Sequence, residues 1–247
     1  MARATGFAPP TAGLPLLGRD LFPDRNAGLE TDLAAFLGVP RVQIECSGTA
    51  AFIVALRTLA DRAPDRDEGG VPAYTCPLVA QAVAACGLKL KLADLSPDSL
   101  DMAPEALDRL CGRRTLAVVP SHLGGRVSDI RPVLAAAHRV GAWVIEDAAQ
   151  ALGARLGAAS VGLQGDIGFY SLAVGKGLSI YEGGVLTARD APLRRALQET
   201  SRRLIPDSRT MEARRIAELI GRAKGGEAKE VVLALPATVD GQTTAHY

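Results

Sequence analysis

The chain of 247 residues has few of the side chains that build metal sites or disulfide scaffolds. Its four cysteines contain no C-x-x-C pair, and only three histidines are present. Neither a zinc site nor a disulfide framework is therefore indicated, and no metal site is expected. Aromatic residues make up 4% of the chain while 48% is hydrophobic, so we expect a core packed mainly by aliphatic side chains.

An excess of charge of one sign is also lacking. There are 28 basic and 27 acidic residues, for a net charge of +1. Proteins that bind nucleic acid or anionic membranes usually carry a strong basic surface, so neither kind of partner is expected. The basic residues gathered between Arg194 and Arg215 are interpreted as the solvated face of a helix.

No stretch of the chain is interpreted as a membrane span. The longest uncharged run, Gly69 to Leu88, approaches the required length, but Pro72, Pro77 and Gln81 interrupt it. We interpret this run as a strand followed by a buried helix. The first fifteen residues lack the apolar region of a signal peptide. These features predict a soluble, cytoplasmic protein.

Short β-rich runs alternate with helical stretches from about Val42 onward. This alternation predicts an α/β fold with a mostly parallel sheet and helices on both faces. The strands are expected at 42–46, 71–74, 88–93, 115–120, 142–147, 167–172 and 184–187. Helices are expected at 49–59, 77–85, 104–110, 129–140 and from about 192, with a loop at 61–70.

Polar residues follow several of the expected strands. They lie in Cys46–Gly48, Tyr74–Cys76, Pro120–His122 and Glu146–Asp147. Ligands of parallel α/β sheets bind at the carboxyl ends of the strands, so we expect these segments to converge on one edge. No G-x-G-x-x-G motif follows a strand, which counts against a nicotinamide-binding enzyme.

Two residues in this arrangement suit the chemistry of pyridoxal phosphate (PLP). Lys176 lies in a glycine-rich segment, and Asp147 ends an apolar run upstream of it. A lysine amine can form a Schiff base with the cofactor aldehyde. A carboxylate can hold the pyridine nitrogen protonated, so that the ring withdraws electrons from the substrate.

Each of the supporting residues also has a plainer interpretation. Ser47–Ala51 could receive a phosphate at a helix start, or could be an ordinary helix cap. Asp147 could likewise only cap the helix that follows it. Gln150 could reach the cofactor's phenolic oxygen, and Ser171 offers a hydroxyl for phosphate or is a plain strand serine.

Five segments occur together in a characteristic order. They are Ser47–Ala51, Val71–Thr75, Pro120–Gly125, Glu146–Gly153 and Phe169–Gly184. In these segments the sequence resembles the DegT/DnrJ/StrS family of PLP-dependent sugar aminotransferases, which have the fold of aspartate aminotransferase (fold type I). The resemblance covers roughly residues 23–204.

The resemblance implies a role for each site residue. Lys176 would be the Schiff-base lysine, Asp147 the partner of the ring nitrogen, and Gln150 a ligand of the phenolic oxygen. The phosphate would be held by Gly48, Thr49 and Ser171. The implied substrates are a nucleotide-linked keto sugar and an amino-acid donor, glutamate.

The resemblance also implies a homodimer, because active sites of such enzymes lie between subunits. Pro72 to Leu88 supports a dimer independently, since it is more apolar than a solvent-facing unit.

Two features depart from the family pattern. Cys76 occupies a position where members commonly stack an aromatic residue on the cofactor ring. The chain also leaves little room for the family's second domain. We expect a PLP-binding large domain at 20–204 and a short remnant at 205–247, a helix plus an irregular tail. The alternative function is therefore a truncated, catalytically impaired PLP-fold protein with a binding or regulatory role.

Overall fold

The computed structural model describes residues 28–180 and 182–205. Seven strands form the main sheet: β1 (Gln43–Glu45), β2 (Glu68–Pro72), β3 (Lys89–Ala93), β4 (Thr115–Val118), β5 (Trp143–Asp147), β8 (Ile167–Ser171) and β9 (Gly184–Ala188). A separate two-stranded ribbon is formed by β6 (Arg155–Leu156) and β7 (Ala159–Ser160). The helices are α1 (Leu29–Leu37), α2 (Gly48–Arg62), α3 (Pro77–Ala85), α4 (Pro104–Leu110), α5 (Arg131–Arg139) and α6 (Ala191–Leu204), with a 3₁₀ turn at Leu123–Gly125.

The main sheet has the order β1-β9-β8-β5-β4-β2-β3. β3, β2, β4, β5 and β8 pair in parallel, whereas β9 runs antiparallel to both of its neighbours, β8 and β1. β1 therefore points the same way as the five parallel strands. Six strands end at one edge of the sheet, and β9 begins there. The expected mostly parallel sheet is confirmed.

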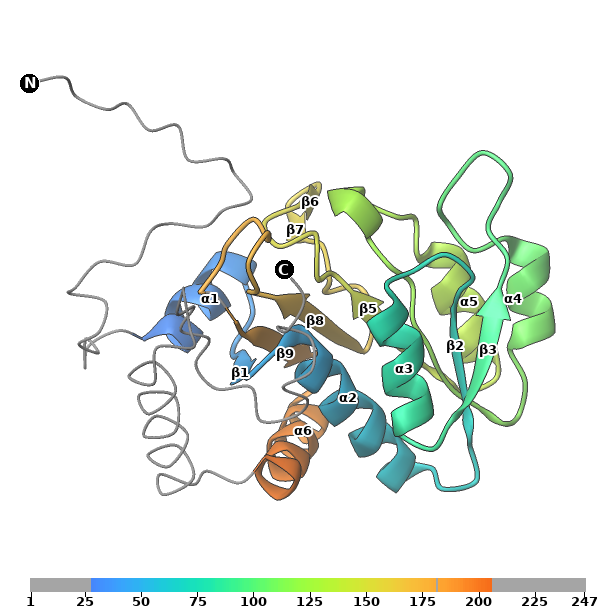
Figure 1. Ribbon diagram of the computed structural model, residues 1–247, viewed down its shortest axis with the longest axis horizontal. Helices are drawn as coiled ribbons and strands as arrows, with labels where there is room; N and C mark the ends of the chain where they lie inside the picture. Colours follow the sequence, from blue (N-terminus) through green and yellow to red (C-terminus); the bar gives the residue numbers. More distant parts are fainter. Residues whose placement is uncertain (1–27, 181, 206–247) are drawn as a thin grey trace, which may run out of the picture.

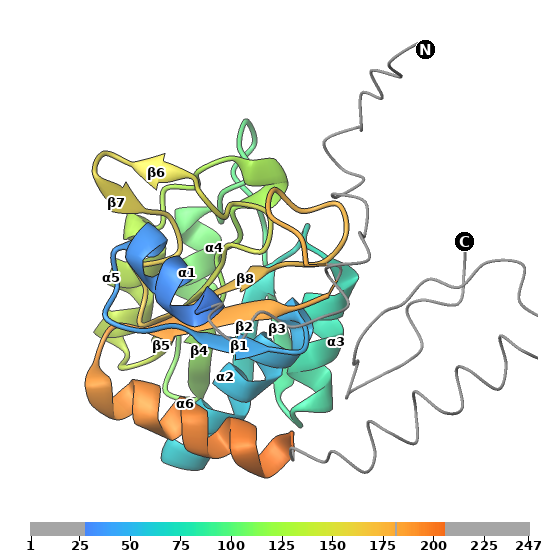
Figure 2. The ribbon, with the colours of Figure 1, turned by 90° about the vertical axis from the view of Figure 1, so that its left-hand side faces the viewer.

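Helices cover both faces of this sheet (Figures 1 and 2). One hydrophobic cluster joins α2, α3 and α6 to one face. On the opposite face, one cluster lies under α4 and α5 and another under α1. The alternation of side chains along β8 shows how the faces separate, because Phe169 stacks on Phe52 of α2 at 5.1 Å while Tyr170 packs toward α1.

The helix ends follow from local sequence. The Ser47 hydroxyl caps α2 by accepting the Ala50 N–H at 3.0 Å. α3, α4, α5 and α6 each have a proline in the first turn, where its missing N–H costs nothing. Gly38 follows α1 with a φ of 75°, a left-handed conformation that glycine adopts without steric cost.

Most expected elements are observed, and two expectations are wrong. α3 and α4 have the expected bounds. The expected loop at 61–70 is not all loop, because β2 begins at Glu68 and pairs with strands on both sides. The glycines of β2 are typical of a loop, so the local sequence did not indicate a strand. Glycine is needed at this position because a Cβ on Gly70 would lie 2.5 Å from Leu110 Cδ2, too close for α4 to pack there. α1 was not expected.

All described residues but Ile205 lie within the expected large domain, whose bounds of 20–204 remain a proposal. Of the expected remnant, 205–247, only Ile205 is among the described residues. The helix and irregular tail expected beyond it lie outside them. In the part of the chain that is described, no helix is long and apolar enough to cross a membrane.

The close approach of β8 to the preceding loop generates the first prediction. A Cβ on Gly168 would lie 1.8 Å from the Gly162 carbonyl oxygen, a backbone atom that cannot rotate away. Gly168→Ala should therefore lower the free energy of unfolding by about 3 kcal/mol or more, measured by urea denaturation. Gly112→Ala is the matched control, because its Cβ would meet nothing within 4 Å. Equal stability of the two variants would contradict the packing described.

Candidate active site at the carboxyl edge of the sheet

Asp147 ends β5 at the edge where the parallel strands terminate. Its side chain is only 8% exposed. The Ala149 N–H donates to Oδ1 at 3.0 Å, and the Ser121 hydroxyl donates to Oδ2 at 3.2 Å. Burial raises the pKa of Asp147, while these two donors and the positive charge of Lys176 act in the opposite direction. No helix begins after Asp147 in the described segment up to β6, so the Ala149 contact closes a turn and the cap role considered from sequence is not observed.

Lys176 lies in the segment between β8 and β9. Its N–H donates to the Ala173 carbonyl at 3.2 Å, and Gly175 before it has a φ of 84°, which closes the turn. The side chain is partly buried. Its ammonium charge acts on the Asp147 carboxyl, so the two residues singled out from sequence lie in one electrostatic neighbourhood.

The expected anion-binding residues also come together. Gly48 begins α2, and a Cβ there would lie 3.0 Å from Ser171 Cβ. Thr49 is the next residue of the same turn. The first N–H groups of a helix have no partner within the helix, and the helix dipole favours an anion beside them. Gly48, Thr49 and Ser171 therefore border a place suited to a phosphate group.

Gly184 completes this contact from β9. In the sheet, Gly184 pairs with Ser171 of β8 on one side and with Glu45 of β1 on the other. A Cβ on Gly184 would lie 2.3 Å from the Ser47 carbonyl oxygen and 2.8 Å from the Gly48 nitrogen. Only glycine allows the start of β9 to lie against the start of α2.

Two of the predicted cofactor-binding residues, Gln150 and Cys76, have no contact with Asp147. Gln150 is exposed, and its Oε1 accepts the Gly124 N–H at 2.6 Å, which leaves the amide NH₂ to donate elsewhere. Cys76 is exposed at the start of α3, directly after Thr75. No contact joins either side chain to Asp147, so their roles remain predictions.

A second carboxylate, Glu146, is buried beside Asp147. It accepts the N–H groups of Gly162, at 3.0 Å, and Gly165, and it bonds His122 Nε2 at 3.0 Å. The Ser128 N–H donates to His122 Nδ1 at 3.1 Å, so the ring proton lies on Nε2 and is donated to Glu146. The hydrogen bonds of Glu146 and His122 therefore fix the loops around the end of β5.

Comparison with known proteins identifies the family. The model of the DegT/DnrJ/EryC1/StrS aminotransferase family matches residues 23–215. The chain belongs to this family. The resemblance seen in the sequence is thereby confirmed, and the mostly parallel sheet is the fold of the family's solved members.

Three related proteins show the extent of the match. UDP-N-acetyl-3-dehydro-alpha-D-glucosamine 3-aminotransferase of Acidithiobacillus ferrooxidans is 35% identical over 176 residues, 71% of this chain and 47% of that protein. L-glutamine:2-deoxy-scyllo-inosose aminotransferase of Streptomyces fradiae is 34% identical over 165 residues, 67% of this chain and 38% of that one.

The third is Spr1654 from Streptococcus pneumoniae, solved in a PLP form. It matches with a TM-score of 0.64 over 70% of this chain and 48% of its own, and at 22% identity the likeness shows the fold alone. The chain spans less than half the length of the curated relatives.

Two hydroxyl residues near Asp147, Ser121 and Thr75, were not assigned roles from the sequence. Each follows a parallel strand, β4 and β2 respectively, and this position was the available signal. What the sequence could not supply is the strand order, which places these two strands next to β5 on one side. Gly184 was missed for the same reason, since its contact with Ser47 depends on β9 pairing with β1.

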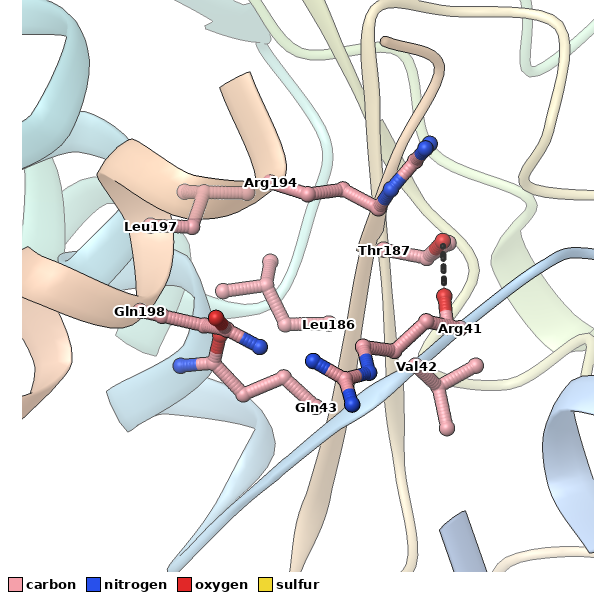
Figure 3. Close-up of a pocket in the computed structure, with 8 residues that line it drawn as sticks. All are labelled: Arg41, Val42, Gln43, Leu186, Thr187, Arg194, Leu197 and Gln198. Carbon is pink, nitrogen blue, oxygen red and sulfur yellow. Dashed lines mark hydrogen bonds between the residues drawn. The ribbon is translucent and has the colours of Figure 1, made fainter. Parts of the chain in front are cut away.

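Two hollows elsewhere on the surface contain none of the predicted residues. One, of about 10 Å³, lies between α6, the start of β1 and the end of β9, where Thr187 Oγ1 donates to the Arg41 carbonyl at 3.3 Å (Figure 3). It holds at most about one water molecule and lies at the opposite edge of the sheet. The other, of about 220 Å³, lies between β3 and α4, where the exposed side chains of Arg109 and Asp94 approach to 4.0 Å. The strand-end residues are the better candidate on chemical grounds.

Within the described ranges, no three His, Cys, Asp or Glu side chains are grouped so that they could hold a metal ion.

The raised pKa of Asp147 predicts a pH-dependent stability of the apoprotein. A carboxyl whose folded pKa exceeds its unfolded value of about 3.9 binds its proton more tightly in the folded state, so stability falls as pH rises through that interval. Asp147→Asn removes this loss. The variant should gain stability over the parent as pH rises from about 4 through the raised pKa of Asp147, by at most about 1.4 kcal/mol per pH unit, in urea unfolding.

The matched control is Asp129→Asn. Arg131 holds the pKa of the Asp129 carboxyl below its usual range, so this variant should lose stability relative to the parent only as pH rises to about 4. Above that pH the difference between this variant and the parent should stay constant. A stability difference between Asp147→Asn and the parent that does not change with pH would show that burial does not disfavour the Asp147 charge.

Proposed function

We propose that the protein is a PLP-dependent aminotransferase that acts on a nucleotide-linked keto sugar with glutamate as the amino donor. One observation carries the proposal: a buried carboxyl, Asp147, lies at the carboxyl edge of the sheet within the field of a lysine, Lys176. Such a pair matches the two protein groups that PLP chemistry needs most, in a chain that belongs to an aminotransferase family.

The residues present fit the two ends of the cofactor. At the ring end, burial raises the pKa of Asp147, and a ring N–H donor would offset the cost of ionising this carboxyl. At the phosphate end, the close approach of Gly48 to Ser171 leaves the first turn of α2 open to an anion. Gln150 has an NH₂ left to donate to a ring oxygen. The solved relative Spr1654 carries PLP in one of its forms.

When bound, PLP supplies an electron-withdrawing ring that stabilises negative charge on the substrate carbon. The protein's contribution would come from two residues. Asp147 would hold the proton on the ring nitrogen and keep the ring electron-withdrawing. Lys176 Nζ would attach the cofactor and, once released, move the proton between the substrate carbon and the cofactor carbon C4′.

The substrate class is proposed from the relatives' names. The relative from Acidithiobacillus ferrooxidans is named for a UDP-linked 3-dehydro sugar, which supports a nucleotide-linked keto sugar. The relative from Streptomyces fradiae is named for L-glutamine and a free keto cyclitol, so glutamine is the donor to compare with glutamate. A cytoplasmic location, expected from the sequence, remains a prediction.

The decisive experiment concerns Lys176. The purified protein with added PLP should show a visible absorbance band that borohydride reduction removes. Lys176→Ala should abolish this band and all transamination, because no other amine is expected to hold the cofactor. The control is Lys91→Ala, since Lys91 lies on β3, paired at 3.9 Å with Glu68, away from the site.

The outcomes separate the alternatives. A reducible band that persists in Lys176→Ala would assign the cofactor to another lysine. A Lys176-dependent band without transamination from glutamate or glutamine to a UDP-linked keto sugar would favour the alternative, a PLP-binding protein that is catalytically impaired. Absence of any band in the parent protein would overturn the proposed function.

We also propose a homodimer. Large apolar side chains near the candidate site are exposed, including Tyr74 at 65%, Leu78, Val174, Leu178 and Ile180. They come from two separate segments, the start of α3 and the loop that carries Lys176. Exposed large apolar side chains beside a polar site are typical of an interface with another subunit.

The homodimer predicts a mass of twice 25.7 kDa by light scattering at micromolar concentration. Replacing both Tyr74 and Leu178 by serine should shift the protein toward the monomer, because it removes apolar contact area at the proposed interface. The matched control replaces Leu92, an equally exposed residue on the β3 edge, and should leave the mass unchanged. A monomeric parent protein would refute the dimer.

A further inference from the structure

Three residues at the ends of adjacent strands form a chain of hydrogen bonds. Thr75 Oγ1 lies 3.2 Å from Ser121 Oγ, and Ser121 Oγ lies 3.2 Å from Asp147 Oδ2. The strands that precede them, β2, β4 and β5, are neighbours in the sheet. Ser121 is 6% exposed, so bulk water does not replace these contacts.

The chemistry of the groups fixes the direction of this chain. An ionised carboxylate only accepts hydrogen bonds, so Ser121 must donate its single hydroxyl proton to Asp147. Ser121 Oγ can then only accept from Thr75, which must donate in turn. The chain therefore runs from Thr75 to Ser121 to Asp147 when Asp147 is ionised.

Each oxygen of Asp147 accepts one hydrogen bond, Oδ1 from the Ala149 N–H and Oδ2 from Ser121. Each carboxylate oxygen has about two acceptor positions, so each retains one for a further donor. We propose that Ser121, supported by Thr75, is a positioning residue that keeps the Asp147 carboxylate ionised and oriented toward a protonated ring nitrogen. This inference rests on the proposed function.

The surroundings leave Ser121 without a substitute. The His122 ring is committed to Glu146 and to the Ser128 N–H, so it cannot take over the contact to Asp147. The groups that act electrostatically on Asp147 are Lys176, in the loop after β8, and the His122 ring, after β4. The Ser121 hydroxyl lowers the pKa of a carboxyl that burial has raised. Losing it should therefore move protonation of Asp147 to higher pH.

The test measures the dissociation constant of PLP between pH 6 and pH 9 in the full chain. Ser121→Ala should weaken binding by about tenfold at pH 6, the usual loss for a hydrogen bond to a charged group. The loss should shrink as pH rises, because a larger fraction of Asp147 is then ionised even without Ser121. Ser121→Thr keeps a hydroxyl and should restore much of the affinity.

Ser128→Ala is the matched control. It also removes a buried serine hydroxyl, and that hydroxyl donates at 2.9 Å to the carbonyl of Ser121 itself rather than to Asp147. Its effect on PLP binding should not vary with pH. Thr75→Val, which removes only the distal donor, should show the Ser121→Ala pattern more weakly and serves if Ser121→Ala does not fold.

The outcomes are distinguishable from failure of the proposed function. A parent protein that binds no PLP would overturn both proposals. A Lys176-dependent PLP band together with a pH-independent effect of Ser121→Ala and Thr75→Val would overturn only the role of Ser121. The same pH-dependent loss in Ser128→Ala would also overturn it, because general loosening of the loop would then explain the result.

Discussion

Removing a carboxylate from water costs several kcal/mol unless nearby donors replace its hydration. Asp147 is in this position, and the polar features of the sheet edge around it supply the replacement. The Ala149 N–H and the Ser121 hydroxyl each satisfy one oxygen, and the positive charge of Lys176 acts from the facing loop. The compensation is incomplete, since burial still dominates the pKa of Asp147. A carboxyl left short of donors is suited to receive one more, which is what binding a protonated ring would provide.

The direction of the strands brings these groups together. Thr75, Ser121 and Asp147 are far apart in sequence, but each follows a strand that points to the same edge. The single reversed strand, β9, contributes from its beginning rather than its end, which puts Gly184 against the start of α2. A side chain at Gly184 would separate β9 from α2 and disturb the place where Gly48 meets Ser171. The phosphate end of the candidate site thus depends on backbone packing, whereas the ring end depends on side-chain hydrogen bonds.

The sequence was sufficient for the parts of the fold that depend on local patterns. Alternating apolar runs predicted the parallel sheet, and prolines and glycines predicted the bounds of α3 and α4. The positions of Asp147 and Lys176 could be expected because both lie beside recognisable strand or turn signals. The sequence was insufficient where tertiary contacts decide. β2 begins among glycines that a local pattern assigns to a loop, and they are tolerated because α4 packs closely there. The roles of Ser121 and Gly184 depend on which strands are neighbours, which no local pattern contains.

Glu146 and Asp147 are consecutive buried carboxylates, and the kind of donor that each accepts separates their roles. Successive residues of a strand point to opposite faces, so the two side chains have different surroundings. Glu146 is bonded by backbone N–H groups of Gly162 and Gly165 and by a histidine whose other nitrogen is also engaged. These donors cannot turn away without unfolding the loops. Asp147 instead receives one backbone N–H and a serine hydroxyl, which can rotate. Glu146 is therefore bound as a structural anchor, while Asp147 keeps the freedom to accept a new partner.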